Sequence, residues 1–119
     1  MTNEPIYHIC RADEWLDAQS IGSYGGSSQD KADGFIHFSA RTQVVDSAAK
    51  HRAGQDGLIL LEVDQVRLGA ALKWELSRND IEFPHLYGDL PVGAVLRSFA
   101  LTLDKEGIHI FPKDWELME

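Results

Sequence analysis

Hydrophobic residues occur along this chain in short runs and alternations, a pattern that favours β-strands over long helices. The run "GLILLEV" at residues 57–63 is almost entirely aliphatic and predicts a central strand buried on both faces. In "LKWELS", Leu72, Trp74 and Leu76 alternate with polar residues, which predicts a half-buried strand with this hydrophobic side inward. Further segments with strand character are "PIYHIC", "FIHFS", "VLRSFALTL" and "IHIF".

Two segments carry signals for helices. Asp13 is placed to cap a short helix over residues 14–18, which would bury Trp15 and Leu16. Ser39 is placed to cap a second helix over residues 41–52, where small and aliphatic residues recur at helical spacing. A loop rich in glycine and serine separates the first helix from "FIHFS". Strands with two helices predict an α+β fold.

The length and charge of the chain narrow the possible classes. With 119 residues it is predicted to form a single domain over residues 1–119. The net charge of −8, spread along the chain, argues against bulk binding of nucleic acid, because that binding depends on neutralising phosphates with Lys and Arg. Arg41, Lys50 and Arg52 lie on one stretch and predict a solvated helix face, although a local basic pocket remains an alternative.

Three features favour the cytoplasm as the location of the protein. The aliphatic run at residues 58–61 is far too short to span a bilayer, so no membrane association is expected. The first ten residues lack the basic and apolar regions of a secretory signal. Cys10 is the single cysteine, which excludes an internal disulfide and fits a reducing compartment.

The histidines are the most unusual chemical feature. Four of the five have large apolar neighbours: His8, His37, His85 and His109. Each is either a hydrogen-bonded core residue or a group that serves recognition or proton transfer, since imidazole titrates near pH ~6.5. Strand alternation puts His8 on one face of the first strand and His37 on one face of the second. If these strands are neighbours, both rings can enter one pocket, whereas His109 is expected to be structural.

Other constellations give weaker signals. The histidines lack the helical spacing of zinc motifs, and no metal is expected. No nucleophile elbow or phosphate loop is present. Glu75, beside Trp74, is either solvated or at the edge of a pocket. The segment "FPHLYG" places His85 and Tyr87 in a rigid aromatic loop that is expected to form a pocket wall.

The motifs "IYHI", "GFIHFS", "LILLEVD", "LKWELS" and "FPHLYG", in that order, resemble the domain-of-unknown-function 952 family between about Ile6 and Leu103. The resemblance implies membership of the ADP-ribosyltransferase-like superfamily. It therefore implies a split, curved β-sheet with short helices and a cleft for a nucleotide, NAD above all, between two halves of the sheet. "GFIHFSA" is also similar to the strand-then-helix segment of poly(ADP-ribose) polymerases and to the "VHLS" stretch of RNA 2′-phosphotransferases.

The resemblance also implies roles for individual residues. His8 matches a first-strand histidine that contacts a ribose, while His37 matches a residue that packs on the nicotinamide end or contacts phosphate. The third position, a glutamate in the polymerases, falls on Glu75 or His85. These three catalytic candidates, His37, Glu75 and His85, are joined by candidate ligand-binding residues, namely His8, Ser39, Trp74 and Tyr87.

Three classes of function follow. The first is an enzyme that binds an NAD or ADP-ribose type of nucleotide and transfers an ADP-ribosyl or ribose-phosphate group, with NAD as the suspected cofactor. The second is a non-catalytic module that binds the same small-molecule nucleotide. The third is a protein-interaction domain in which the histidines are structural. Convergence of His8, His37 and His85 on one concave pocket, with Trp74 or Tyr87 in its wall, would argue against the third class.

Overall fold

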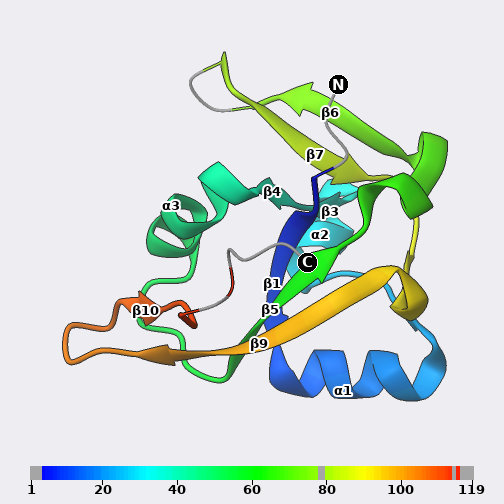
Figure 1. Cartoon of the computed structure of the whole chain (residues 1–119). Coiled ribbons are helices and arrows are strands. Elements are labelled where there is room, and N and C mark those ends of the chain that lie inside the picture. Colours follow the sequence, from blue (N-terminus) through cyan, green and yellow to red (C-terminus); the bar gives the residue numbers. More distant parts are fainter. Residues whose placement is uncertain (1–3, 78–79, 114, 116–119) are drawn as a thin grey trace.

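The computed structural model describes residues 4–77, 80–113 and 115. Its largest feature is a strongly curled antiparallel sheet with the strand order β10-β9-β5-β1-β4 (Figure 1). In that order the strands span His109–Ile110, Val95–Leu103, Leu58–Val63, Ile6–Arg11 and Ser39–Ala40. The predicted mixture of α and β structure is confirmed, with the sheet curled into a half-barrel and the helices short.

A smaller antiparallel sheet has the order β3-β7-β6, with bounds Ile36–His37, Glu82–Leu86 and Leu72–Leu76. The short strands β2 (Ser23–Tyr24) and β8 (Leu90–Pro91) pair separately. The predicted strand "FIHFS" joins the two main sheets, because β3 pairs with β7 whereas β4 pairs with β1. Phe38, between β3 and β4, still donates its backbone N–H to the carbonyl oxygen of Pro84 at 2.9 Å.

Helix α1 (Ala12–Ile21) is longer than the predicted 14–18. Its first turn is stabilised by the Glu14 carboxylate, which accepts the Arg11 backbone N–H at 3.2 Å. It ends at Gly22, whose φ of 103° lies in the left-handed region that glycine tolerates best. The helix packs through Trp15 and Ala18, so the predicted burial of Leu16 is wrong: that side chain is 68% exposed.

Helix α3 (Arg41–His51) follows β4 directly. Its N-cap is Ala40, and the side chain of Gln43 accepts the Ala40 backbone N–H at 2.8 Å. The predicted cap by Ser39 is therefore wrong, because Ser39 belongs to β4 and donates its hydroxyl to Ser47 at 3.2 Å. The remaining helical elements are α2 (Ser28–Asp33) and the 3-10 helices η1 (Gln65–Ala71) and η3 (Val92–Ala94).

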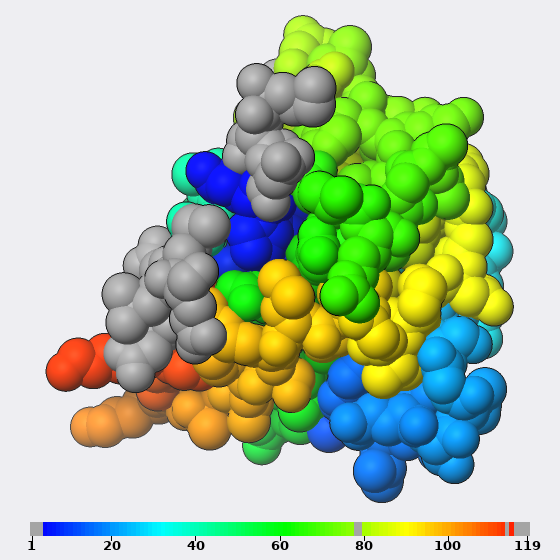
Figure 2. Space-filling model, turned by 45° about the vertical axis from the view of Figure 1, so that its right-hand side comes forward, coloured from blue at the N-terminus to red at the C-terminus, as the bar shows by residue number. Residues whose placement is uncertain are grey.

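The core confirms the central position predicted for the aliphatic run. Strand β5 lies between β1 and β9, and its residues Leu60 and Leu61 are fully buried on opposite faces of the sheet. Figure 2 shows β9, in orange and yellow, crossing one side of the molecule above α1. Trp115 is buried and packs edge-on against Tyr7, with ring centroids 5.3 Å apart.

The hydrophobic side of β6 is the main error in the predicted burial. Trp74 is 37% exposed and Leu76 is 66% exposed. Strand β6 is the edge of the small sheet, and the β6–β7 hairpin extends beyond the rest of the molecule (Figure 1). The predicted alternation along β6 is correct. However, no other element of the described chain covers the part of this face that carries Trp74 and Leu76.

No helix in residues 4–77, 80–113 or 115 has the length and apolar character needed to cross a membrane.

Candidate functional site

A cavity of about 540 Å³ opens where the large sheet and the small sheet separate. Strand β1 pairs with β4 only at Ile6 and Tyr7, so the edge of β1 beyond Tyr7 faces the cavity. Arg52, at the end of α3, reaches this edge and donates from Nη2 to the carbonyl oxygen of Ile9 at 3.0 Å. The cavity walls thus come from both sheets, from α3 and from the start of α2.

His8 lies in the deepest layer of the site and is only 4% exposed. Its Nδ1 is 2.6 Å from the carbonyl oxygen of His37, which can only accept, so Nδ1 carries the proton. Its Nε2 is 2.8 Å from the Tyr24 hydroxyl. Burial lowers the pKa of His8 below its usual value, so the ring is neutral and Nε2 accepts the Tyr24 proton. Both ring nitrogens therefore serve to hold the strands together.

Asp30 holds His37 in place through two hydrogen bonds. This carboxylate is 3% exposed, and its Oδ1 accepts from Nδ1 of His37 at 2.5 Å and from the His37 backbone N–H at 3.1 Å. Its Oδ2 accepts the backbone N–H of Ser27 at 2.8 Å. Burial alone raises the pKa of Asp30, but these hydrogen bonds and the nearby His8 outweigh it and lower the pKa to about 2.

The environment of His37 favours its charged form. Its hydrogen bond to Asp30 raises its pKa above the usual value, against the opposing effect of burial. Its Nε2 lies 3.0 Å from Oδ2 of Asp33, the last residue of α2, so each ring N–H has a carboxylate acceptor. The His37 side chain is 41% exposed, which leaves this imidazolium within reach of a ligand.

A second carboxylate–histidine pair lies on the small sheet. Oε1 of Glu75 accepts from the Tyr87 hydroxyl at 2.7 Å and from Nδ1 of His85 at 2.8 Å. These two hydrogen bonds lower the pKa of Glu75, so the carboxylate is ionised and Nδ1 of His85 carries a proton. Phe35 stacks on the His85 ring with centroids 4.1 Å apart, and the His85 and His37 ring centroids are 5.6 Å apart.

The predicted site residues divide into two groups. His8, His37, Ser39 and His85 line the cavity. The expected pocket wall of Trp74 and Tyr87 is not part of that lining, nor is Glu75, which acts on the cavity only through His85. Trp74 points from the opposite face of β6 to Glu75, because neighbouring residues of a strand alternate.

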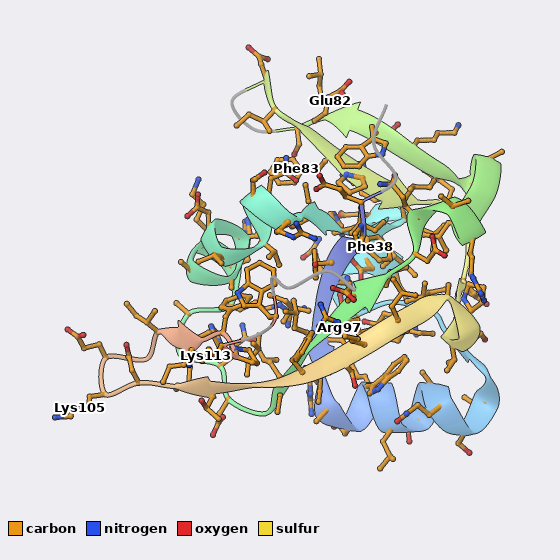
Figure 3. All side chains as sticks on the ribbon, in the orientation of Figure 1. Phe38, Glu82, Phe83, Arg97, Lys105 and Lys113 are labelled. Carbon is orange, nitrogen blue, oxygen red and sulfur yellow. The ribbon has the colours of Figure 1, made fainter. Side chains whose placement is uncertain are left out.

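Two functional candidates escaped the analysis of the sequence. Asp30 has a local signal, since Ser27 and Asp30 form a capping box at the start of α2. The sequence favours a solvated helix face for Arg52 and gives a local basic pocket as the alternative; Arg52 lines the cavity, in agreement with the alternative. Aromatic side chains complete the walls; Figure 3 shows Phe83 on β7 near the start of α3 and Phe38 below it.

Within the described parts of the chain, no group of three or more His, Cys, Asp or Glu side chains is arranged to hold a metal ion. The cavity lining itself carries charged and polar groups. Arg52 and His37 supply positive charge, while Ser27, Ser39 and Ser47 supply hydroxyls.

The fold and site define a class: a curled antiparallel α+β domain with a cavity, lined by histidines, at the split between two sheets. Residues 9–98 match the family model described as "Protein of unknown function (DUF952)", and the chain belongs to this family. No match is found among the curated proteins.

Solved structures of a related protein agree with the fold. The crystal structure of protein CC0527 from Caulobacter crescentus is 46% identical, with a TM-score of 0.86, over 89% of this chain and 93% of that chain. The solution NMR structure of CC0527 is 47% identical, with a TM-score of 0.78, over 87% of this chain and 90% of that one. The architecture is therefore shared with an experimentally determined relative.

Proposed function

We propose that this protein binds a nucleotide of the NAD or ADP-ribose type in the histidine-lined cavity and catalyses transfer at a ribose-phosphate group. The proposed localisation is the cytoplasm, where such nucleotides are abundant substrates and cofactors. Assignment to the ADP-ribosyltransferase-like superfamily is part of the same proposal.

One observation carries this proposal: the His37 imidazolium, the His85 ring and the Arg52 guanidinium all line one cavity. Cations in a partly enclosed site attract anions more strongly than they would in bulk water, and guanidinium groups match phosphate geometry. The chain as a whole carries a net charge of −8, which disfavours the binding of anions elsewhere. A local group of cations in one cavity is therefore a stronger indication of an anion site than it would be in a basic protein.

The other walls support a nucleotide over a bare inorganic anion. Hydroxyls of Ser39 and Ser47 can contact ribose hydroxyls, and the rings of Phe38 and Phe83 offer apolar surface to a base. The volume of about 540 Å³ falls within the range of about 300–1,000 Å³ typical of small-molecule sites. Arg52, His37 and these serines are the residues that would hold the phosphate and ribose end of NAD.

The positions of the carboxylates favour ribose-phosphate transfer over ADP-ribosyl transfer. Cleavage at the ribose carbon of NAD develops positive charge there, which a carboxylate facing the sugar would stabilise. Asp30 lines the cavity, but its two carboxylate oxygens already accept hydrogen bonds from His37 and Ser27. Glu75 is held by His85 and Tyr87 outside the cavity lining. The cavity therefore offers proton donors and cations to the ligand rather than a carboxylate.

A thermal-shift screen with NAD, ADP-ribose and nucleoside phosphates tests the binding. At a ligand concentration about 100 times the Kd, binding adds about 2.7 kcal/mol of stability. For a domain of this size that corresponds to a rise in Tm of roughly 8 °C. The variant Arg52→Met should reduce the rise, and Lys105→Met, at the distal turn before β10 (Figure 3), should leave it unchanged. Absence of a shift with every nucleotide would contradict the proposal.

A non-catalytic nucleotide-binding module is the second candidate, and one observation favours it. Both ring N–H groups of His37 already have carboxylate acceptors, Asp30 and Asp33, which suits a fixed positive charge as well as a proton donor. A protein that shows the thermal shift but turns over no nucleotide would have this second function.

A further inference from the structure

We propose that His85 and His37 act as general base and general acid in the hydrolysis of a phosphodiester whose leaving group is an alcohol, such as a nucleoside 2′,3′-cyclic phosphate. This inference rests on the proposed function, because it takes the nucleotide site as given and assigns the reaction. Two carboxylate-supported histidines that face one cavity, with ring centroids 5.6 Å apart, carry the inference.

His85 has the arrangement required of a base. The Glu75 carboxylate accepts the proton on Nδ1 at 2.8 Å, so in the base form of the ring the lone pair is on Nε2. Within the described part of the chain, no hydrogen bond occupies Nε2 of His85. Stacking against Phe35, at 4.1 Å between centroids, fixes the plane of the ring. The ring is thus oriented by a carboxylate and an aromatic neighbour, with one nitrogen available to accept a proton.

His37 has the complementary arrangement of an acid. Asp30 holds the proton on Nδ1, and the proton on Nε2 points to Oδ2 of Asp33 at 3.0 Å. Asp33 is 38% exposed and is tied to Gln29, a cavity residue, by a hydrogen bond of 3.1 Å. An ester oxygen of the substrate can therefore replace the Asp33 carboxylate as the acceptor at Nε2, which delivers the proton where it is needed.

The hydrolysis balances with water as the co-reactant. The oxygen of water forms a bond to phosphorus while His85 Nε2 takes one of its protons. The bond between phosphorus and the ester oxygen breaks, the electron pair stays on that oxygen, and His37 Nε2 gives it a proton. The products are a phosphomonoester and an alcohol; exchange with solvent returns His85 to the neutral form and His37 to the charged form.

The single thiol of the chain does not support a covalent route. Cys10 is fully buried, and burial raises the pKa of its thiol to about 12, so it is not a thiolate near neutral pH. Arg52 is placed to neutralise charge on the phosphate in the cavity. Displacement at phosphorus by water, with proton removal by His85 and proton donation by His37, uses the two histidines whose rings lie next to each other in the cavity.

Two probes with different leaving groups test the roles. Adenosine 2′,3′-cyclic phosphate releases an alkoxide, which needs a proton, whereas thymidine 5′-(4-nitrophenyl) phosphate releases a stable phenolate, which does not. We expect His85→Asn to lower the rate by roughly 10²–10⁴-fold with both probes. We expect His37→Asn to lower it by the same factor with the cyclic phosphate and by less than about 10-fold with the nitrophenyl ester.

Each variant is assayed with both probes, and the two losses of rate are compared. Partial unfolding cannot imitate the expected result, because a folding defect lowers both rates equally. Equal losses for His37→Asn with the two probes would overturn the assignment of His37 as the acid. Wild-type protein whose Tm rises with nucleotides, but which hydrolyses neither probe, would overturn this inference and leave the proposed binding intact. If no nucleotide raises the Tm of the wild-type protein, the proposed function itself is contradicted.

Discussion

Two buried carboxylates lie on opposite faces of the large sheet and differ in the cation that neutralises them. Glu62, on β5, is 4% exposed and forms a two-pronged ion pair with Arg97, at 2.8 and 2.7 Å. Asp30, on α2, is 3% exposed and is paired with His37. An arginine stays protonated at every pH that the fold tolerates, whereas a histidine exchanges its proton near neutrality.

The two pairs have different roles: the Glu62–Arg97 pair stabilises the fold, whereas the Asp30–His37 pair can take part in a reaction. Tyr7, Glu62 and Arg97 are directly opposite one another on β1, β5 and β9, and the Tyr7 hydroxyl donates to Glu62 at 2.9 Å. That row stabilises three neighbouring strands and contains no histidine. The Asp30–His37 pair lies at the wall of a cavity and leaves its ring 41% exposed. Only the second pair can pass a proton to a ligand.

The largest expected effect comes from breaking the arginine pair. Arg97→Met would leave Glu62 charged and buried without its counter-ion, and such a loss costs about 3–5 kcal/mol of unfolding free energy. Urea denaturation at neutral pH measures it, with Lys105→Met as the matched control at the exposed turn before β10. A loss below about 1 kcal/mol would show that Glu62 is solvated, and it would contradict the structural role of the Glu62–Arg97 pair.

Asp30→Asn should have a smaller effect that depends on pH. The folded pKa of Asp30 is about 2 against an ordinary 3.8, so its stabilisation of about 2 kcal/mol is present above pH ~4 and is lost as the pH falls towards 2. The pKa of His37 is raised above 6.5, so its contribution is present below that value and is lost as the pH rises through the folded pKa.

The stability difference between wild type and Asp30→Asn should therefore be greatest between pH ~4 and ~6.5. Urea titrations at several pH values measure this difference directly. A difference that does not vary with pH would contradict the assignment of charge to the Asp30–His37 pair.

Tyr24→Phe should lower the unfolding free energy by about 1–2 kcal/mol, because Nε2 of His8 then has no donor in a buried site. Thermal denaturation measures the loss, and nucleotide binding should persist because both His8 nitrogens serve the fold. Loss of nucleotide binding with little change in Tm would instead make His8 a ligand residue.

Glu75→Gln should have the smallest effect on stability and a clear effect on catalysis. The carboxylate is partly exposed, so the free energy of unfolding should change little. Hydrolysis of the cyclic phosphate should fall by roughly 10–100-fold, since His85 loses the group that fixes its tautomer. Glu82→Gln, on β7 at the outer part of the hairpin (Figure 3), is the matched control. Equal rates for both variants would contradict the role of Glu75.

Local patterns predicted much of the fold and some of the site. The aliphatic run of β5 and the β-type composition of "PIYHIC" identify two strands that are buried on both faces. Strand alternation then places His8 on the same side of β1 as Ile6 and Cys10, so this side could be predicted. The exposure of Trp74 could not, because burial of that face depends on whether another element covers an edge strand.

The contacts that make the site depend on pairing between distant segments. His37 and His85 are neighbours because β3 pairs with β7 in a register that places these two residues opposite each other. Arg52 reaches the cavity because α3 runs beside the open edge of β1, which no local spacing specifies. Asp30 is the exception, since the capping box that holds it is visible in four consecutive residues.

The most direct test of this account is the protonation state of each histidine, measured by long-range proton–nitrogen NMR at pH ~6.5. The account predicts a neutral His8 with its proton on Nδ1 and a predominantly charged His37, with protons on both nitrogens. Addition of ADP-ribose should shift the resonances of His37 and His85 and leave those of His109 unchanged. A neutral His37, or resonances of His37 and His85 that do not respond to the nucleotide, would contradict the central claim.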